Sequence, residues 1–117
     1  MNLERYIVPE DMSILDTMKA INKGAKGNVF VCRDGKLLAV VTDGDIRRYI
    51  IGSGDLNESV GKIANYHPVF VTRNENVDVA ALMRAEGITA LPVIDSDGKL
   101  IDIIFHLLVE TLKSRQK

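Results

Sequence analysis

Short apolar runs separated by turn residues dominate the pattern of the chain. Residues 29–32 and 37–41 are apolar, and they flank the pair Asp34-Gly35. Glycine accepts a positive φ and aspartate tolerates one, so this pair suits the tight turn of a hairpin. The pattern therefore predicts two neighbouring strands joined by a short turn.

A helical pattern precedes this hairpin. Four apolar residues recur at helical spacing, which predicts an amphipathic helix with one apolar face. Ser13 and Asp16 have the spacing of a capping box, a common helix start. A short extended piece, residues 6–9, comes before it. The apolar face consists of Ile14, Leu15, Met18 and Ile21.

The hairpin pattern occurs twice. Asp34-Gly35 recurs as Asp97-Gly98, 63 residues further along, and Gly24 and Gly87 have the same spacing. At this offset, residues 92–95 correspond to residues 29–32. The second helical pattern, Val77, Ala80 and Met83, lies at an offset of 62. We therefore expect an extra residue between the second helix and its following strand, and a cap at Asn74 or Asn76.

The duplication predicts an α+β fold built from two β-α-β-β-α units. Each unit is too small to bury a good core alone, so we expect the two sheets to pack about a pseudo-twofold axis. The units are assigned to residues 1–58 and 59–117, and the turn-rich residues 52–58 form the connector. Residues 105–115 have the pattern of a final helix.

Composition and charge narrow the possible partners. The chain has 117 residues, of which 46% are hydrophobic, as in ordinary globular proteins. Its net charge of −1 provides no basic field for nucleic acid, and no apolar run reaches the roughly 20 residues that span a bilayer. We expect a cytoplasmic protein that binds neither nucleic acid nor membrane.

Reactive side chains are few. Cys32 lies in an apolar strand pattern, which favours a small buried residue over a catalytic thiol. His67 and His106 belong to no cluster with metal-ligand spacing, so we expect no metal. A small enzyme is the weakest hypothesis, because no catalytic constellation supports it.

Residues 42–48, with the sequence TDGDIRR, carry the most chemistry. They join an apolar strand pattern to a helical one, and helix starts have unpaired N–H groups and a positive dipole that suit anions. Thr42 and Asp45 also have the spacing of a capping box, which any helix can use. The sequence allows two interpretations of these residues, a ligand site and a capped helix start, and both can hold together.

These motifs together resemble a tandem pair of cystathionine-β-synthase-type (CBS) domains. The resemblance is carried by the duplication, by the strand of residues 91–95 (LPVID), and by the strand end VTDGD at residues 41–45. TDGDIRR, the Gly54-Asp55-Leu56 loop and residues 65–69 are similar to the CBS pair attached to sugar-phosphate nucleotidyltransferases. Sugar-phosphate isomerases of the arabinose-5-phosphate type carry a similar pair.

The resemblance implies a cleft that binds AMP or a related adenine nucleotide. Thr42 and Asp45 would contact phosphate and ribose, Gly44 would allow close approach, and Arg47 and Arg48 would neutralise phosphate charge. The apolar wall for the base would be formed by Ile7, Val8 and Val29, with Asn28 offering an edge hydrogen bond.

The second copy departs from this pattern. An offset of 63 places Phe105 at the position of Thr42 and Leu108 at that of Asp45, and neither can bind ribose or phosphate. Asp102 takes the position of Ala39, where a carboxylate would oppose an anion. We expect at most one competent nucleotide site in the chain.

The resemblance implies a regulatory module, not an enzyme, covalently attached to a catalytic domain. A nucleotidyltransferase is the expected parent and a sugar-phosphate isomerase the alternative. The rival hypothesis is a structural dimerisation module with an empty cleft. In either case we expect a homodimer that associates through helix faces, to which these residues could contribute: Tyr49, Ile50, Ile51, Leu108 and Leu112.

Overall fold

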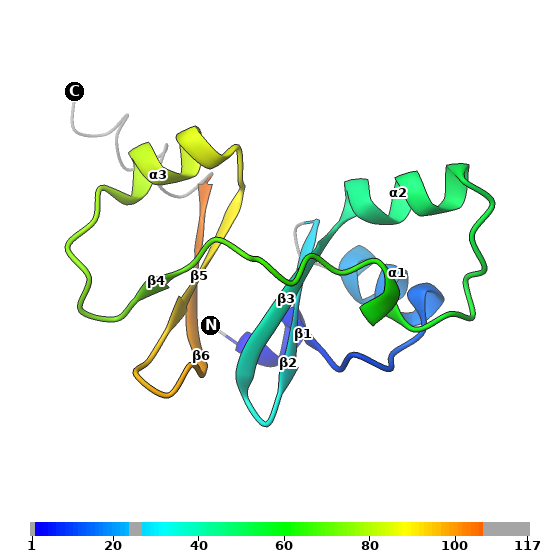
Figure 1. The fold of residues 1–117 in the computed structure, drawn as a ribbon, viewed down its shortest axis with the longest axis horizontal. Helices are drawn as coiled ribbons and strands as arrows, with labels where there is room; N and C mark the ends of the chain where they lie inside the picture. Colours follow the sequence, from blue (N-terminus) through cyan, green and yellow to red (C-terminus); the bar gives the residue numbers. More distant parts are fainter. Residues whose placement is uncertain (1, 24–26, 107–117) are drawn as a thin grey trace. The chain divides into compact units, whose positions relative to one another are not determined.

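Each half of the chain forms a three-stranded sheet, and the strands pair in the same way in both (Figure 1). The computed structural model describes residues 2–23 and 27–106. Their contacts divide the chain into unit 1, Met1–Pro68, and unit 2, Val69–Lys117. In each sheet the first strand is parallel to the second, which is antiparallel to the third. The predicted α+β class is confirmed.

Unit 1 places two helices beside its sheet. Helices α1 and α2 contact one another, and they contact β2 and β3 respectively. Apolar side chains such as Phe30 and Ile14 have no exposed surface and form the core. The elements in order are η1 (Leu3–Tyr6), β1 (Ile7–Val8), α1 (Ile14–Asn22), β2 (Asn28–Arg33), β3 (Lys36–Thr42), α2 (Asp43–Ile51) and η2 (Val60–Lys62).

Unit 2 repeats this plan with one described helix. Its core is built on Val71, Met83 and Leu91. The predicted final helix lies outside the described residues from 107 onwards, and Phe105 ends a strand rather than starting that helix. The elements in order are β4 (Val71–Thr72), α3 (Val79–Glu86), β5 (Ala90–Ile94) and β6 (Leu100–Phe105).

The two hairpins differ in length, which corrects the predicted alignment of the repeats. Asp34 and Gly35, with φ of 53° and 80°, form the whole loop between β2 and β3. In unit 2 the loop runs from residue 95 to 99, and its Gly98 has a φ of 84°. The extra residue therefore lies in this loop and not between helix and strand.

The strand pairing fixes the corrected correspondence. Phe105 pairs with Ala90 as Thr42 pairs with Asn28, so β5 follows β2 at an offset of 62, not 63. The β-bulges have the same offset of 62, because one lies between residues 31 and 32 in β2 and the other between residues 93 and 94 in β5.

The second helix starts later than predicted. Asp78, not Asn74 or Asn76, is its cap, and the Asp78 side chain accepts from the backbone N–H of Ala81 at 3.1 Å. Val77 precedes this cap and packs with Leu82 against the core of unit 2. This pair has the positions of a hydrophobic staple, which fixes where the chain enters a helix.

The connector belongs to unit 1. The backbone N–H of Ile14 donates to the carbonyl of Glu58 at 2.9 Å, and Asn65 exchanges two backbone hydrogen bonds with Val40 of β3. The contacts divide the chain after Pro68. The predicted domain boundary between residues 58 and 59 stays a prediction. The pseudo-twofold packing of the two sheets concerns the relation between units and stays a prediction.

Candidate functional site

The start of α2 contains the capping box that the sequence allowed. Thr42 is the last residue of β3 and the cap of α2. Its Oγ1 accepts from the backbone N–H of Asp45 at 3.2 Å, and Asp45 Oδ2 accepts from the backbone N–H of Thr42 at 2.9 Å. Both side chains are therefore fixed at the point where the strand becomes a helix.

Arg48 adds a cation to this helix start. Its Nη2 lies 2.5 Å from Asp45 Oδ1, one turn back along α2. A Cβ placed at Gly44 would lie 3.2 Å from Arg48 Nη1 and 3.7 Å from Thr42 Oγ1. A hydroxyl, a carboxylate and a guanidinium thus surround a residue without a side chain. These groups can accept from sugar hydroxyls and donate to phosphate.

Asn28 and Ile7 share one face of the sheet with Thr42. Asn28 is the direct partner of Thr42 across β2 and β3, and Ile7 pairs with Phe30, two residues further along β2. Paired residues point to the same face and alternate residues return to it. The structure therefore brings these predicted site residues to the side of the sheet on which Thr42 lies.

Val8 and Val29 lie on the opposite face. Val8 pairs with Val31 and Val29 pairs with Val41, which places all four out of phase with Asn28. Val29 is 0% exposed and Val8 is 1% exposed. The structure makes both part of the core of unit 1 and does not bring them to the Thr42 face.

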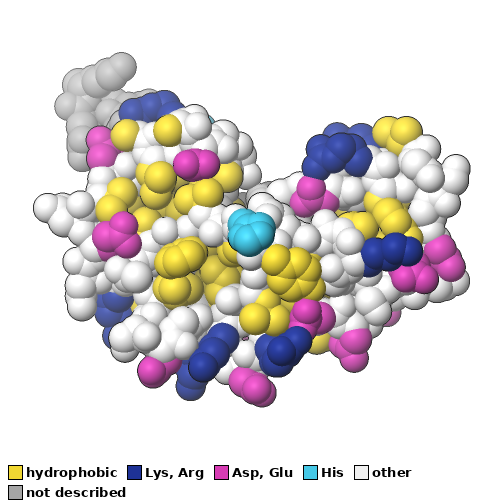
Figure 2. Space-filling model, viewed as in Figure 1, with side chains coloured by type: hydrophobic (Ala, Val, Ile, Leu, Met, Phe, Trp, Pro, Cys, Tyr) yellow, Lys and Arg dark blue, Asp and Glu magenta, His cyan; other side chains and the backbone are white. Residues whose placement is uncertain are grey.

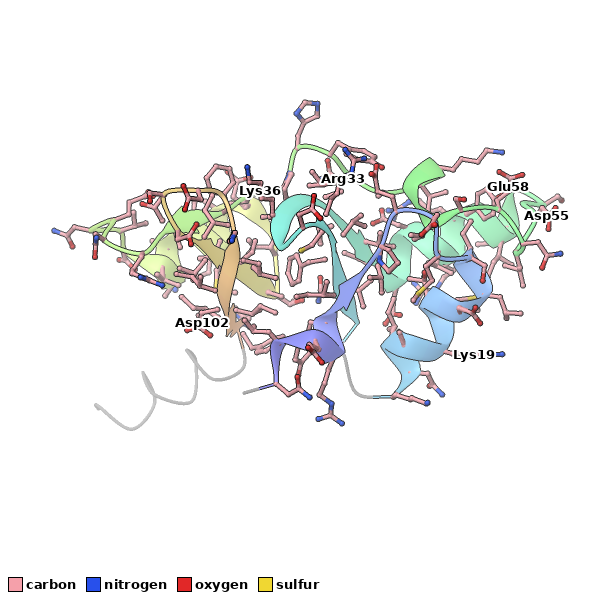
Figure 3. The ribbon with its side chains drawn as sticks, turned by 90° about the horizontal axis from the view of Figure 1, so that it is seen from below. Lys19, Arg33, Lys36, Asp55, Glu58 and Asp102 are labelled. Carbon is pink, nitrogen blue, oxygen red and sulfur yellow. The ribbon has the colours of Figure 1, made fainter. Side chains whose placement is uncertain are left out.

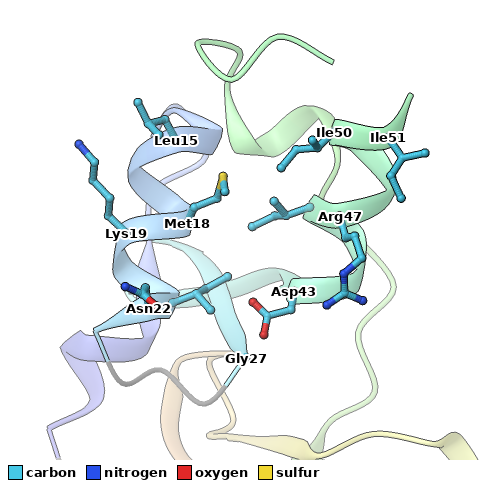
Figure 4. A pocket seen from close by; sticks show the side chains of 11 residues that line it. Leu15, Met18, Lys19, Asn22, Gly27, Asp43, Arg47, Ile50 and Ile51 are labelled. Atoms are coloured by element: carbon cyan, nitrogen blue, oxygen red, sulfur yellow. The ribbon is translucent and has the colours of Figure 1, made fainter. Parts of the chain in front are cut away.

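Arg47 lines a groove between α1 and α2 (Figure 4). The groove encloses about 770 Å³ and lies within unit 1. Figure 2 shows Lys and Arg side chains gathered over α2 with hydrophobic side chains beside them. The groove is lined by Leu15, Met18, Lys19, Ile21, Asn22, Gly27, Asp43, Ile46, Arg47, Ile50 and Ile51.

The equivalent positions in unit 2 lack the polar groups. The strand pair that carries Asn28 and Thr42 in unit 1 carries Ala90 and Phe105 in unit 2. Asp102 of β6 pairs with Val93, is exposed, and accepts from the backbone N–H of Ile103 at 2.8 Å (Figure 3). Leu108 and Leu112 lie outside the described residues.

Tyr49 and Cys32 both have structural roles within unit 1. The Tyr49 hydroxyl donates to the Asp55 carbonyl at 3.1 Å and accepts from the Asp55 N–H at 3.0 Å, which holds the loop after α2. Cys32 is buried in β2, as predicted, and burial raises the pKa of its thiol to about 11.

Residues 2–23 and 27–106 contain no group of three acidic, His or Cys side chains that could hold a metal ion. No helix in the same residues is long and apolar enough to cross a membrane.

One cluster was missed by the sequence analysis. Glu10 accepts a hydrogen bond from the Tyr66 hydroxyl and pairs with Arg33. The three residues are far apart in the sequence and share no motif, so no local signal could have joined them.

Comparisons with known proteins give a family and several relatives. A family model of the CBS domain matches residues 1–52 and 60–105. The arabinose 5-phosphate isomerase GutQ of Escherichia coli O6:H1 is 33% identical over 94 residues, which cover 79% of this chain and 29% of that protein. The homoserine O-acetyltransferase of Methanosarcina acetivorans is 31% identical over 107 residues, which cover 89% of this chain and 19% of that protein. The chain thus spans less than a third of either relative.

A solved structure also resembles this chain. It is a CBS domain protein from Pyrobaculum aerophilum complexed with AMP. The TM-score is 0.76 and the identity is 25%, over 91% of this chain and 90% of that chain.

Proposed function

The chain belongs to the CBS domain family, and from this premise we propose that it is a regulatory module that binds an adenine nucleotide at the start of α2 in unit 1. The arrangement of Thr42, Asp45 and Arg48 around Gly44 carries the proposal. The AMP complex of the Pyrobaculum aerophilum protein supports the ligand class.

Each group has a distinct part in binding. The Asp45 carboxylate accepts hydrogen bonds from ribose hydroxyls, and its charge makes them stronger than neutral ones. The α2 N-terminus, the Thr42 hydroxyl and Arg48 favour the phosphate. Asn28 and Ile7, on the Thr42 face, offer an amide and an apolar side chain to the base. Arg47 and the valines Val8 and Val29 are left out of this set.

We expect one nucleotide per chain. The unit 2 positions equivalent to Thr42 and Asn28 are Phe105 and Ala90, which have no polar side-chain atoms. Asp102 adds an exposed carboxylate that would oppose a phosphate. A titration that gave two equivalent nucleotides per chain would contradict this part of the proposal.

The parent protein is proposed to be an enzyme of sugar-phosphate metabolism, regulated by this module. The relative GutQ favours the isomerase alternative over the nucleotidyltransferase that the sequence first suggested. The homoserine O-acetyltransferase relative indicates that a similar module can belong to an enzyme that catalyses a different reaction. A nucleotide would act by linkage, because a ligand shifts a conformational equilibrium only by its differential affinity for the two states.

Isothermal titration calorimetry tests the proposal. AMP, GMP and CMP are titrated into the wild-type chain and into Asp45→Asn, which keeps the size of the side chain and removes its charge. We expect Asp45→Asn to weaken AMP binding by about ten-fold or more. Asp78→Asn is the matched control, since Asp78 caps α3 in unit 2. AMP affinity that survives Asp45→Asn would place the site elsewhere.

A second candidate function is dimerisation through α1 and α2. Ile51 is 76% exposed, Ile50 is 42% exposed and Leu15 is 38% exposed, and all three line the groove between these helices. Exposed apolar patches of this kind mark interaction surfaces. Sedimentation velocity should then show a dimer that Ile51→Glu dissociates, whereas Phe70→Glu, at an exposed apolar residue of unit 2, should not. A dimer that binds none of the nucleotides would favour a scaffold.

A further inference from the structure

Both oxygens of the Asp45 carboxylate already have partners. Oδ2 accepts from the Thr42 backbone N–H at 2.9 Å, and Oδ1 lies 2.5 Å from Arg48 Nη2. The first bond belongs to the capping box and is part of the helix start. Arg48 therefore pairs with the carboxylate oxygen that is not committed to the backbone, so a ribose hydroxyl that binds this oxygen competes with Arg48 for it.

The position of Arg48 depends on Asp45. Its guanidinium folds back over the first turn of α2, so that Nη1 lies within 3.2 Å of the point where a Cβ of Gly44 would stand. A cation at a helix N-terminus is disfavoured by the helix dipole. The Asp45 carboxylate offsets this cost, and a ligand phosphate at the same place would offset it too.

The ion pair is also easy to break. The Arg48 side chain is 72% exposed and that of Asp45 is 22% exposed, and an ion pair with an exposed partner contributes little because solvent screens that charge. By contrast, a guanidinium binds phosphate through two parallel charge-assisted hydrogen bonds. The free energy lost when Arg48 leaves Asp45 is therefore smaller than the free energy gained when it pairs with the phosphate.

We propose that Arg48 is an exchangeable partner, which leaves Asp45 when ribose binds and pairs with the phosphate of the same ligand. The inference rests on the proposed nucleotide function and assigns it a specificity. A nucleoside must displace Arg48 without giving it a new partner, whereas a nucleotide supplies one. The site thereby selects phosphorylated over unphosphorylated adenosine.

The competing arrangement makes a different prediction. If Arg48 stayed on Asp45 and bound phosphate from there, Arg48→Gln would weaken AMP and leave adenosine unchanged or weaker. In the exchange, Arg48→Gln removes the competitor for Asp45 and the partner of the phosphate together. AMP and adenosine then respond in opposite directions.

Calorimetric titrations of AMP and adenosine against the wild-type chain and Arg48→Gln test the exchange. We expect Arg48→Gln to weaken AMP by about ten-fold and to strengthen adenosine by about two- to five-fold. Lys62→Gln, which removes a cation from the exposed pair with Glu58, is the matched control and should change neither affinity.

The outcomes separate the two proposals. Binding of AMP by the wild type, with adenosine unchanged or weakened in Arg48→Gln, would overturn the exchange alone. A wild-type chain that bound neither ligand would overturn the proposed function and the exchange with it. An unchanged thermal unfolding midpoint of Arg48→Gln verifies that the variant is folded.

Discussion

The Tyr66 hydroxyl donates a 2.7 Å hydrogen bond to Glu10 Oε2 and so joins residues 56 positions apart. The other oxygen of Glu10 pairs with Arg33. Beside them the Gly61 N–H donates to the Glu10 carbonyl at 3.0 Å. The chain after the connector is thus anchored to unit 1 as far as Tyr66, and His67 and Pro68 lie between this residue and unit 2.

Tyr66→Phe should destabilise unit 1 in a pH-dependent way. The hydrogen bond from Tyr66, and next the one from Arg33, lower the pKa of Glu10 below its ordinary value of 4.5. A lowered carboxyl pKa contributes stability above the unfolded value, and this contribution is lost as pH falls through the folded value. The variant should therefore unfold at lower urea than wild type at pH 7, and the difference should shrink below about pH 4.5.

Tyr49→Phe is the control for this prediction. The Tyr49 hydroxyl bonds to the backbone carbonyl and N–H of Asp55, and these backbone groups carry no titratable charge. We expect its effect on the urea midpoint to be the same at pH 7 and at pH 4. A Tyr66→Phe effect that is equally flat with pH would mean that the Glu10 contact contributes nothing measurable.

Gly54→Ala should destabilise the loop after α2. A Cβ at Gly54 would clash with the Tyr49 ring, so the ring must move and lose its bonds to Asp55. Overpacking of this kind costs about 1–3 kcal/mol in the free energy of unfolding. Gly52→Ala is the control, because its Cβ would lie 3.5 Å from the Arg48 carbonyl oxygen, an ordinary van der Waals distance. Equal urea midpoints for the two variants would contradict the prediction.

Patterns local in sequence predicted much of this fold. The capping box of Thr42 and Asp45, the turn at Asp34-Gly35 and the burial of Cys32 follow from spacing and residue type, and the structure confirms them. Each depends on atoms within a few residues of one another. For the same reason, the sequence alone identifies the polar residues at the start of α2 as a candidate site.

Strand register and contacts between residues far apart in the sequence could not be predicted from local patterns. The repeat pattern places β5 at an offset of 63 and the structure at 62, because the extra residue lies in a hairpin loop, whose length can vary without changing the strands. Val29 and Asn28 were grouped as site neighbours, although a strand sends adjacent side chains to opposite faces. The Asp78 cap depends on Val77 packing into the core, and that contact is tertiary.

Thr42→Ala should separate capping from ligand binding. Loss of the hydroxyl removes the acceptor for the Asp45 N–H and should lower the free energy of unfolding by about 0.5–2 kcal/mol without any ligand. Thr42→Ser keeps the oxygen and should restore most of this stability. Ser13→Ala, which removes the equivalent acceptor at α1, is the control: it should cost similar stability and leave AMP affinity unchanged.

Cys32 should resist thiol reagents in the native protein. Burial raises the pKa of its thiol from 9.0 to about 11, and the thiolate is the reactive form. Two pKa units reduce the thiolate fraction at pH 8 by about a hundred-fold relative to the unfolded chain. Labelling with a chromogenic disulfide reagent should accordingly be slow in buffer and fast in urea. Because folding favours the protonated thiol, the contribution of Cys32 to stability should be constant below pH 9 and decline as pH rises toward 11. Rapid labelling of the native chain at pH 8, with Cys32→Ser as the blank, would show that β2 opens or that the thiol is accessible.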